Sequence, residues 1–124
     1  MAEYQAKIVE ASKELTARER LMVKDTSNAI SIDEATQTSP LIIEPTDYAV
    51  VDVHNDMADN QDYTKYVIFD RQGNKYATGS KSFWEAFKDI YDEMKGEDST
   101  YSIEIYRIES KNFKGKSFIT CSII

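Results

Sequence analysis

The chain has 124 residues, of which 41% are hydrophobic and 30% charged, and its net charge is −7. These values favour one soluble globular domain, and no stretch approaches the roughly 20 apolar residues of a membrane span. The first residues also lack the apolar core of a signal peptide, and the one cysteine, Cys121, excludes an internal disulfide and suits a reducing compartment. We therefore expect a cytoplasmic protein.

The charge is unevenly distributed along the chain. An acidic balance taken alone argues against nucleic acid, because an excess of basic residues usually carries the attraction to phosphate. Residues 63–81, however, carry a net charge of +3, and residues 99–124 carry +2. Because these two basic blocks hold +5 of a total of −7, the rest of the chain carries −12. The basic blocks are candidates for a nucleic-acid surface, and the remainder is a candidate acidic surface.

Residues 1–47 carry mixed signals. Apolar residues recur at helical spacing at Tyr4, Ile8, Ala11 and Leu15, and Thr16 with Glu19 matches a capping box for a further helical turn. The segments 20–25 and 29–33 are equally compatible with short strands around a turn, and we expect strands there. Residues 34–47 contain two prolines around Leu41-Ile42-Ile43 and are typical of a connector with a short extended piece.

The pattern between residues 48 and 78 is that of β-strands. Residues 48–54 are rich in β-branched side chains and predict a strand, and residues 55–62 have the composition of a loop. Residues 65–70 and 75–78 predict two further strands, joined at Asp70–Asn74 by a turn that contains Gly73.

Residues 79–96 predict one amphipathic α-helix. Its apolar stripe is made by Phe83, Trp84, Phe87, Ile90, Tyr91 and Met94. Ser82 and Glu85 have the spacing of a capping box, and Gly96 can end the helix in the left-handed conformation. A stripe this rich in aromatic residues needs a large apolar partner, and strand sequence flanks it on both sides. We expect the helix to pack on a sheet, with Trp84 in the core.

The last third of the chain predicts two more strands, at residues 101–108 and 118–124, around a basic loop at 109–116. The resulting order, β-β-β-α-β-β, is that of an OB-fold, a small barrel with one helix between strands three and four. We therefore expect a mainly β, OB-like domain over residues 1–124. Within it, residues 48–124 form the OB-like core, and residues 1–47 are an N-terminal extension packed on the barrel.

The usual ligand face of an OB-fold coincides with the basic blocks. That face is built by strands two and three, here 65–78, and by the loop between strands four and five, here 109–116. Cations that track a backbone, together with aromatic rings that stack on bases, bind single strands with little sequence preference. The candidate residues for this role are Lys65, Tyr66, Arg71, Lys75, Tyr76, Tyr106, Arg107, Lys111, Phe113, Lys114, Lys116 and Phe118. Against this prediction, the loop at 55–62 is acidic and would repel phosphate unless it points away.

The alternation of side chains ranks these candidates. In the last two strands, Ile103, Ile105, Ile119, Cys121 and Ile123 fall on one face each. We take the isoleucine-rich faces as core, which makes Tyr106 and Phe118 better ligand candidates. Phe113, surrounded by polar and basic neighbours, is the best single candidate for stacking.

Other chemistry finds no support in the sequence. His54 is the one histidine and has no cysteine cluster beside it, so we expect no metal site. The aspartates at 52, 56, 59 and 62 lack the spacing of a calcium loop and are expected to form an acidic loop. Cys121 is expected to be a small core residue. No nucleophile elbow, P-loop or dinucleotide motif is present, so we expect neither catalysis nor a cofactor.

Several short motifs resemble those of small single-stranded-DNA-binding proteins of bacteriophages that infect Gram-positive bacteria. They are Thr78-Gly79-Ser80 leading into Ser82-Phe83-Trp84, the run 110–116 and Phe118-Ile119-Thr120-Cys121, with a weaker echo at 15–27. The resemblance implies an OB-like fold and a protein that coats exposed strands in replication or recombination, in the host cytoplasm. Many such proteins end in an acidic tail that recruits partners, whereas this sequence ends inside a predicted strand, so we do not expect recruitment through a tail.

The function expected from the sequence is therefore sequence-tolerant binding of single-stranded DNA. The alternative is an acidic interaction module, such as a phage-encoded inhibitor that presents the −12 surface to a host protein. The expected partners are single-stranded DNA and replication or recombination proteins, without a membrane. The apolar end Ile123-Ile124 also suggests a homodimer in which the last strand extends a partner's sheet.

Overall fold

In a computed structural model, the chain forms two compact units. The structure describes residues 4–57, 61–97, 100–110 and 116–124. The first unit contains residues 1–30 and 46–79, and the second contains residues 31–45 and 80–124. Each unit is described by itself below. That the whole chain acts as one domain, with a boundary at residue 47, stays a prediction.

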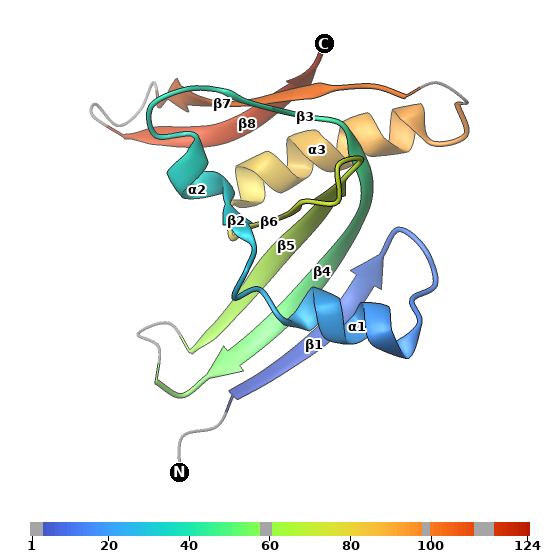
Figure 1. The fold of residues 1–124 in the computed structure, drawn as a ribbon. Coiled ribbons are helices and arrows are strands. Elements are labelled where there is room, and N and C mark those ends of the chain that lie inside the picture. The colour runs from blue at the N-terminus through green and yellow to red at the C-terminus, as the bar shows by residue number, and fades with distance from the viewer. Residues whose placement is uncertain (1–3, 58–60, 98–99, 111–115) are drawn as a thin grey trace. The chain divides into compact units, whose positions relative to one another are not determined.

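Within the described residues, eight strands and three helices follow one another (Figure 1). Their bounds are β1 (Tyr4–Ala11), α1 (Ala17–Lys24), β2 (Ile30–Ser31), α2 (Ile32–Ala35), β3 (Leu41–Ile43), β4 (Pro45–Asn55), β5 (Asp62–Asp70), β6 (Lys75–Thr78), α3 (Lys81–Met94), β7 (Ile103–Glu109) and β8 (Ser117–Ile123). The strands pair as a five-stranded sheet in the order β1-β4-β5-β6-β2 and a three-stranded sheet in the order β3-β7-β8. The order β4-β5-β6-α3-β7-β8 confirms the mainly β, OB-like class.

The core of the first unit lies between one face of its sheet and α1. Ala49, Val51 and Val53 of β4 are buried with Val67 of β5 and Val23 of α1. The alternation along β4 sends every second side chain to this face, as the β-branched pattern predicts. The predicted strands at 48–54, 65–70 and 75–78 are all confirmed, as is the antiparallel hairpin between β5 and β6.

The helical spacing at residues 4–15 was misleading, because β1 is a strand. It pairs with β4 in antiparallel register from Tyr4 opposite Asn55 to Ala11 opposite Ala49. Side chains spaced by four share a face in a strand as well as in a helix, so Tyr4 and Ile8 fit both structures. A register shift between Ile8 and Glu10 then moves Ala11 to the same face.

The strand expected at 20–25 is also wrong, and the open alternative holds. Helix α1 begins at a complete capping box, in which the Thr16 hydroxyl accepts from the Glu19 amide and the Glu19 carboxylate accepts from the Thr16 amide. The strand expected at 29–33 is limited to the two residues of β2. Ser31 then caps α2 by accepting from the Glu34 amide at 3.2 Å.

In the second unit, α3 packs against β8 and covers one face of the three-stranded sheet (Figure 1). Phe83 and Phe87 are fully buried, their rings stacked at 5.8 Å, whereas Trp84 is only half-buried. The predicted cap is displaced by two residues: Ser80 accepts from the Phe83 amide, and Ser82 instead donates to the carbonyl of Ile119 at 2.7 Å. Gly96 has the predicted left-handed conformation, with φ +93°.

The structure predicts that Gly73, in the β5–β6 turn, tolerates a side chain less well than Gly79, which follows β6. Gly73 has φ +86°, where a side chain is strained, so Gly73→Ala should lower the free energy of unfolding by about 1 kcal/mol. Gly79→Ala is the matched control, because the new Cβ would meet only the Thr64 carbonyl oxygen at an ordinary 3.7 Å. Urea unfolding of both variants measures this. Equal stability of the two variants would contradict the prediction.

Candidate nucleic-acid interface

The second unit leaves one face of its three-stranded sheet open. In β7 and β8, Ile108 lies opposite Phe118 and Tyr106 opposite Thr120, while in β3, Ile42 lies opposite Glu104. Paired residues of antiparallel strands share a face, and the other face is the one that α3 covers. We call the side chains of the uncovered side the open face: Ile42, Glu104, Tyr106, Ile108, Phe118, Thr120 and Ser122.

The open face is largely apolar and accessible. Phe118 and Ile108 are each 41% exposed, and Ile42 is 58% exposed. The Tyr106 ring is half-buried, and its hydroxyl lies 2.7 Å from that of Ser122, which fixes the position of the ring on the sheet. The predicted ranking is thus confirmed for Ile103, Ile105, Ile119 and Cys121, which are buried, and for Phe118, which is not. It is wrong for Ile123, which is 47% exposed near the end of β8. Burial also raises the pKa of the Cys121 thiol to about 12.

The sequence between β7 and β8 is basic. The Ser110 amide donates to the Lys116 carbonyl at 2.8 Å and closes the base of the loop. Lys116 is exposed two residues before Phe118. Lys111, Phe113 and Lys114 lie outside the described residues, so their roles stay predictions.

Arg107 lies on the covered side and binds protein oxygens. Its guanidinium donates to the Asp33 carbonyl at 2.7 Å and to the Ser117 hydroxyl at 3.3 Å, while its buried Nε has no partner within the part of the chain that the structure describes. Arg107 therefore links α2 to the first residue of β8, which occupies donors that a phosphate would otherwise use.

Two of the predicted cations in the first unit hold α1 and the residues after it. Lys75 donates to the carbonyls of Met22 and Asp25 at the carboxyl end of α1, where a positive charge also suits the helix dipole. Lys65 donates to the Thr26 hydroxyl at 2.7 Å, and its ammonium lies 6.0 Å from the centre of the Tyr63 ring. Both lysines have a structural role here.

The predicted aromatic residues of β5 and β6 are buried. Tyr66 and Tyr76 are only 8% and 4% exposed and share one face of the hairpin. The Tyr76 hydroxyl donates to the Asp70 carboxylate at 2.7 Å, and burial together with that carboxylate raises its pKa to about 12. Neither ring offers a stacking face in this conformation. Arg71 is exposed in the turn between the two strands.

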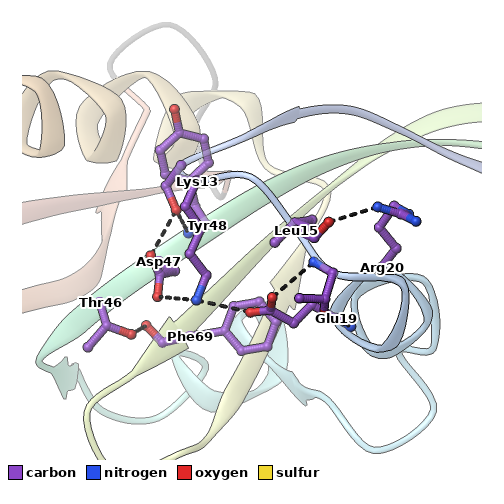
Figure 2. A network of polar contacts seen from close by, with 10 residues as sticks. Lys13, Leu15, Glu19, Arg20, Thr46, Asp47, Tyr48 and Phe69 are labelled. Atoms are coloured by element: carbon purple, nitrogen blue, oxygen red, sulfur yellow. Dashed lines mark hydrogen bonds and ion pairs between the residues drawn. The ribbon is translucent and has the colours of Figure 1, made fainter.

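A polar network that the sequence analysis missed surrounds Lys13 in the first unit (Figure 2). The Lys13 ammonium lies 3.0 Å from Glu19 Oε2 and 3.7 Å from Asp47 Oδ2. Hydrogen bonding to Glu19 and the charges of both carboxylates raise the pKa of Lys13, while the Thr16 amide and Lys13 hold the pKa of Glu19 down at about 2. The capping box was the one sequence signal for this network, because it places Glu19.

Two carboxylates contact the ring nitrogens of His54 near the end of β4. Nδ1 lies 2.8 Å from Asp62 Oδ1, and Nε2 lies 2.6 Å from Asp56 Oδ1. Hydrogen bonds to Asp62 and Asp56 raise the pKa of His54. Two aspartates of the acidic loop thus contact both ring nitrogens of His54. The Asn55 amide donates to the Gln61 carbonyl at 2.7 Å across the same loop. Asp59 lies outside the described residues.

The contacts of Lys75 predict a structural effect. Lys75→Met leaves the last carbonyls of α1 without their cation and should lower the free energy of unfolding by about 1 kcal/mol. Thermal or urea unfolding measures this, with Lys24→Met, an exposed lysine of the same helix end, as the control. If Lys75→Met instead weakened DNA binding more than it weakened the fold, Lys75 would be a phosphate contact.

The two carboxylates beside His54 predict that the stability of the fold depends on pH. Because its folded pKa lies above the ordinary 6.5, protonated His54 stabilises the fold below pH 6.5, and this contribution is lost as the pH rises through the folded pKa. His54 gives the one imidazole signal of the chain, so an NMR titration reads its pKa directly. Asp62→Asn should bring the value back toward 6.5. An unperturbed wild-type pKa would contradict the contacts of His54 with Asp56 and Asp62.

Among the residues that the structure describes, no helix is long and apolar enough to cross a membrane.

Comparison with known proteins assigns the chain to a family. Neither the curated proteins nor the solved structures gave a match. The model of one family, the phage single-stranded DNA-binding proteins of the Phi29 type, matches residues 5–124. Since this match covers nearly the whole sequence, the chain belongs to the Phi29-type family of phage single-stranded DNA-binding proteins.

Proposed function

We propose that this protein coats single strands that are exposed during phage replication or recombination, and that the open face of the second unit is where bases stack. The observation that carries the proposal is the exposure of Phe118, Ile108 and Ile42 on a sheet whose other face is covered by α3. An apolar patch left open on a folded unit marks an interaction surface. In a family that binds single-stranded DNA, bases are the apolar partner to expect.

The chemistry of the open face suits stacking without base recognition. Aromatic rings accept the flat side of any base, and Phe118 and Tyr106 supply two such rings on adjacent strands. The hydrogen bond to Ser122 occupies the Tyr106 hydroxyl, so the ring contributes mainly its face. This combination supports binding that tolerates any sequence.

Phosphates would be neutralised by the lysines of the basic loop at 109–116. Lys116 is exposed directly before β8, and Lys111 and Lys114 precede it in the sequence. Phe113, in the same loop, is a further stacking candidate. We do not include Arg107, Lys65 or Lys75, since each of them donates to a protein oxygen, nor the buried Tyr66 and Tyr76.

The site of action would be the host cytoplasm, with replication or recombination proteins as protein partners. A homodimer through the last strand also stays a proposal. Both proposals rest on the assignment to a family of single-stranded DNA-binding proteins.

The stacking role predicts the effect of truncating one ring. Phe118→Ala should weaken binding of a labelled oligo(dT) about tenfold, because one base loses its stacking partner. Leu21→Ala is the control, since Leu21 is a 69% exposed apolar residue of α1, outside the second unit. Fluorescence anisotropy measures both affinities, with duplex DNA of equal length as competitor. Equal affinity of the two variants would remove the open face from the proposal.

The same titration at several salt concentrations tests the role of the basic loop. Affinity should fall with salt, and Lys116→Glu should reduce the slope of log affinity against log salt by about 0.7 or more, the value of one lost phosphate contact on a single strand. Lys81→Glu is the charge-matched control at the amino end of α3, where a carboxylate suits the helix. Binding that is insensitive to salt would contradict phosphate neutralisation.

A further inference from the structure

We propose that a cavity in the first unit, bounded by Lys13, Leu15, Asp47 and Phe69, holds one nucleobase of the bound strand. The cavity has a volume of about 190 Å³. This inference rests on the proposed function for the source of the base, but it concerns a site separate from the open face. The residues that form the cavity belong to the β1–α1 connection, α1, β4 and β5.

The size of the cavity limits its occupant. Pockets for drug-sized ligands span about 300–1,000 Å³, so a cavity of about 190 Å³ suits a single ring system and is too small for a whole nucleotide. Its walls are mainly apolar. Leu15 and Phe69 are half-buried, Met22 is exposed at the rim, and Val23 and Tyr48 line the cavity from the buried interior. A phenyl ring and a thioether both pack well against a flat heteroaromatic ring.

Lys13, Glu19 and Asp47 of the polar network in Figure 2 also line this cavity. The Lys13 ammonium and Asp47 Oδ2 are 3.7 Å apart, too far to hydrogen-bond each other. The other Asp47 oxygen already accepts from the Ser12 hydroxyl at 3.1 Å, and Lys13 is held by Glu19 at 3.0 Å. The pair therefore places a donor and an acceptor side by side, across a gap that the adjacent acceptor and donor of a base edge can bridge.

The three charged side chains that line the cavity disfavour a phosphate as the occupant. One ammonium stands between two carboxylates, so the group carries a net charge of −1 and repels an anion. A neutral base with an amino or imino hydrogen meets no such repulsion.

The site is also held in place before any ligand arrives. Glu19 is fixed by the capping box, with its Oε1 accepting from the Thr16 amide at 3.0 Å. Lys75 binds the carbonyl of Met22 at 2.8 Å and so fixes the backbone at the rim, and the Thr46 hydroxyl donates to the Phe69 carbonyl at 3.3 Å. A pocket with fixed walls gains affinity because little ordering remains to be done on binding.

The test uses the full chain with ¹³C-labelled methionine methyl groups, which give four signals, one of them from Met22. Each of the four deoxynucleosides is titrated, and deoxyribose 5-phosphate is the probe without a base. The expected result is a saturable shift of the Met22 signal at millimolar nucleoside, with no shift from deoxyribose 5-phosphate. No Met22 shift with any nucleoside, or an equal shift with the sugar phosphate, would overturn the inference.

Two variants locate the contact. Lys13→Ala should weaken nucleoside binding about tenfold, because a charge-assisted donor to the base is lost. Lys24→Ala removes the same charge from an exposed residue of α1 outside the cavity and should leave nucleoside binding unchanged. A second spectrum that reports the fold, such as that of the backbone amides, identifies a variant that fails to fold. Equal nucleoside binding by both variants would reject Lys13 as the donor.

The two proposals fail in different ways. Oligo(dT) binding that depends on Phe118, without any Met22 shift from nucleosides, would leave the open face standing and remove the cavity as a base site. A Met22 shift from nucleosides with oligo(dT) affinity insensitive to Phe118→Ala would do the reverse.

Discussion

The two-residue period of β7 and β8 is the constraint on which the second unit depends. One set of alternating side chains is buried with α3, and this burial supplies the apolar contact that the helix needs. The other set is thereby committed to the opposite side of the sheet, whatever its chemistry. Because Tyr106, Ile108 and Phe118 belong to that second set, apolar groups stand exposed where a strand of DNA could cover them. A slip of one residue in the register would bury these rings and expose the isoleucines.

The basic residues of this protein have two kinds of role. Lys75, Lys65 and Arg107 each donate to oxygens of the chain itself, and in doing so they hold α1, the segment after it and α2. Lys13 is likewise held between two carboxylates. The cations that we propose for phosphate contacts are those of the basic loop at 109–116. Net charge along the sequence therefore overstates the surface available to DNA, since it counts structural and exposed cations alike.

Much of the fold followed from local sequence rules. The β-branched run of β4, the turn around Gly73 and the aromatic stripe of α3 each have one strong structural interpretation, and each is found. Residues 1–35 were harder, because Tyr4 and Ile8 fit two periodicities and only the pairing with β4 selects the strand. The cap of α3 was misplaced since two serines two residues apart could serve, and Ser82 is taken by Ile119 in a distant strand.

At the candidate site, too, local sequence rules predicted some features, whereas others depend on contacts between distant residues. Alternation sorted Phe118 from Ile119 correctly, because it depends on neighbours in sequence. It could not show that Tyr66 and Tyr76 are both buried, or that Lys75 meets the end of a helix more than 50 residues earlier in the chain, because these contacts exist only after folding. The cavity beside Lys13 lies beyond such rules for the same reason, because three separate stretches of the sequence form it.

The register shift in β1 has a consequence for the behaviour of the protein at high concentration. β1 is an edge strand, and a regular exposed edge invites pairing with the edge of another molecule. The shift between Ile8 and Glu10 interrupts the hydrogen-bonding ladder, and the charged side chains of Lys7 and Glu10 flank it. Both features oppose sheet-to-sheet aggregation along this edge. Such protection would suit the proposed coating, in which many copies lie close together on one strand of DNA.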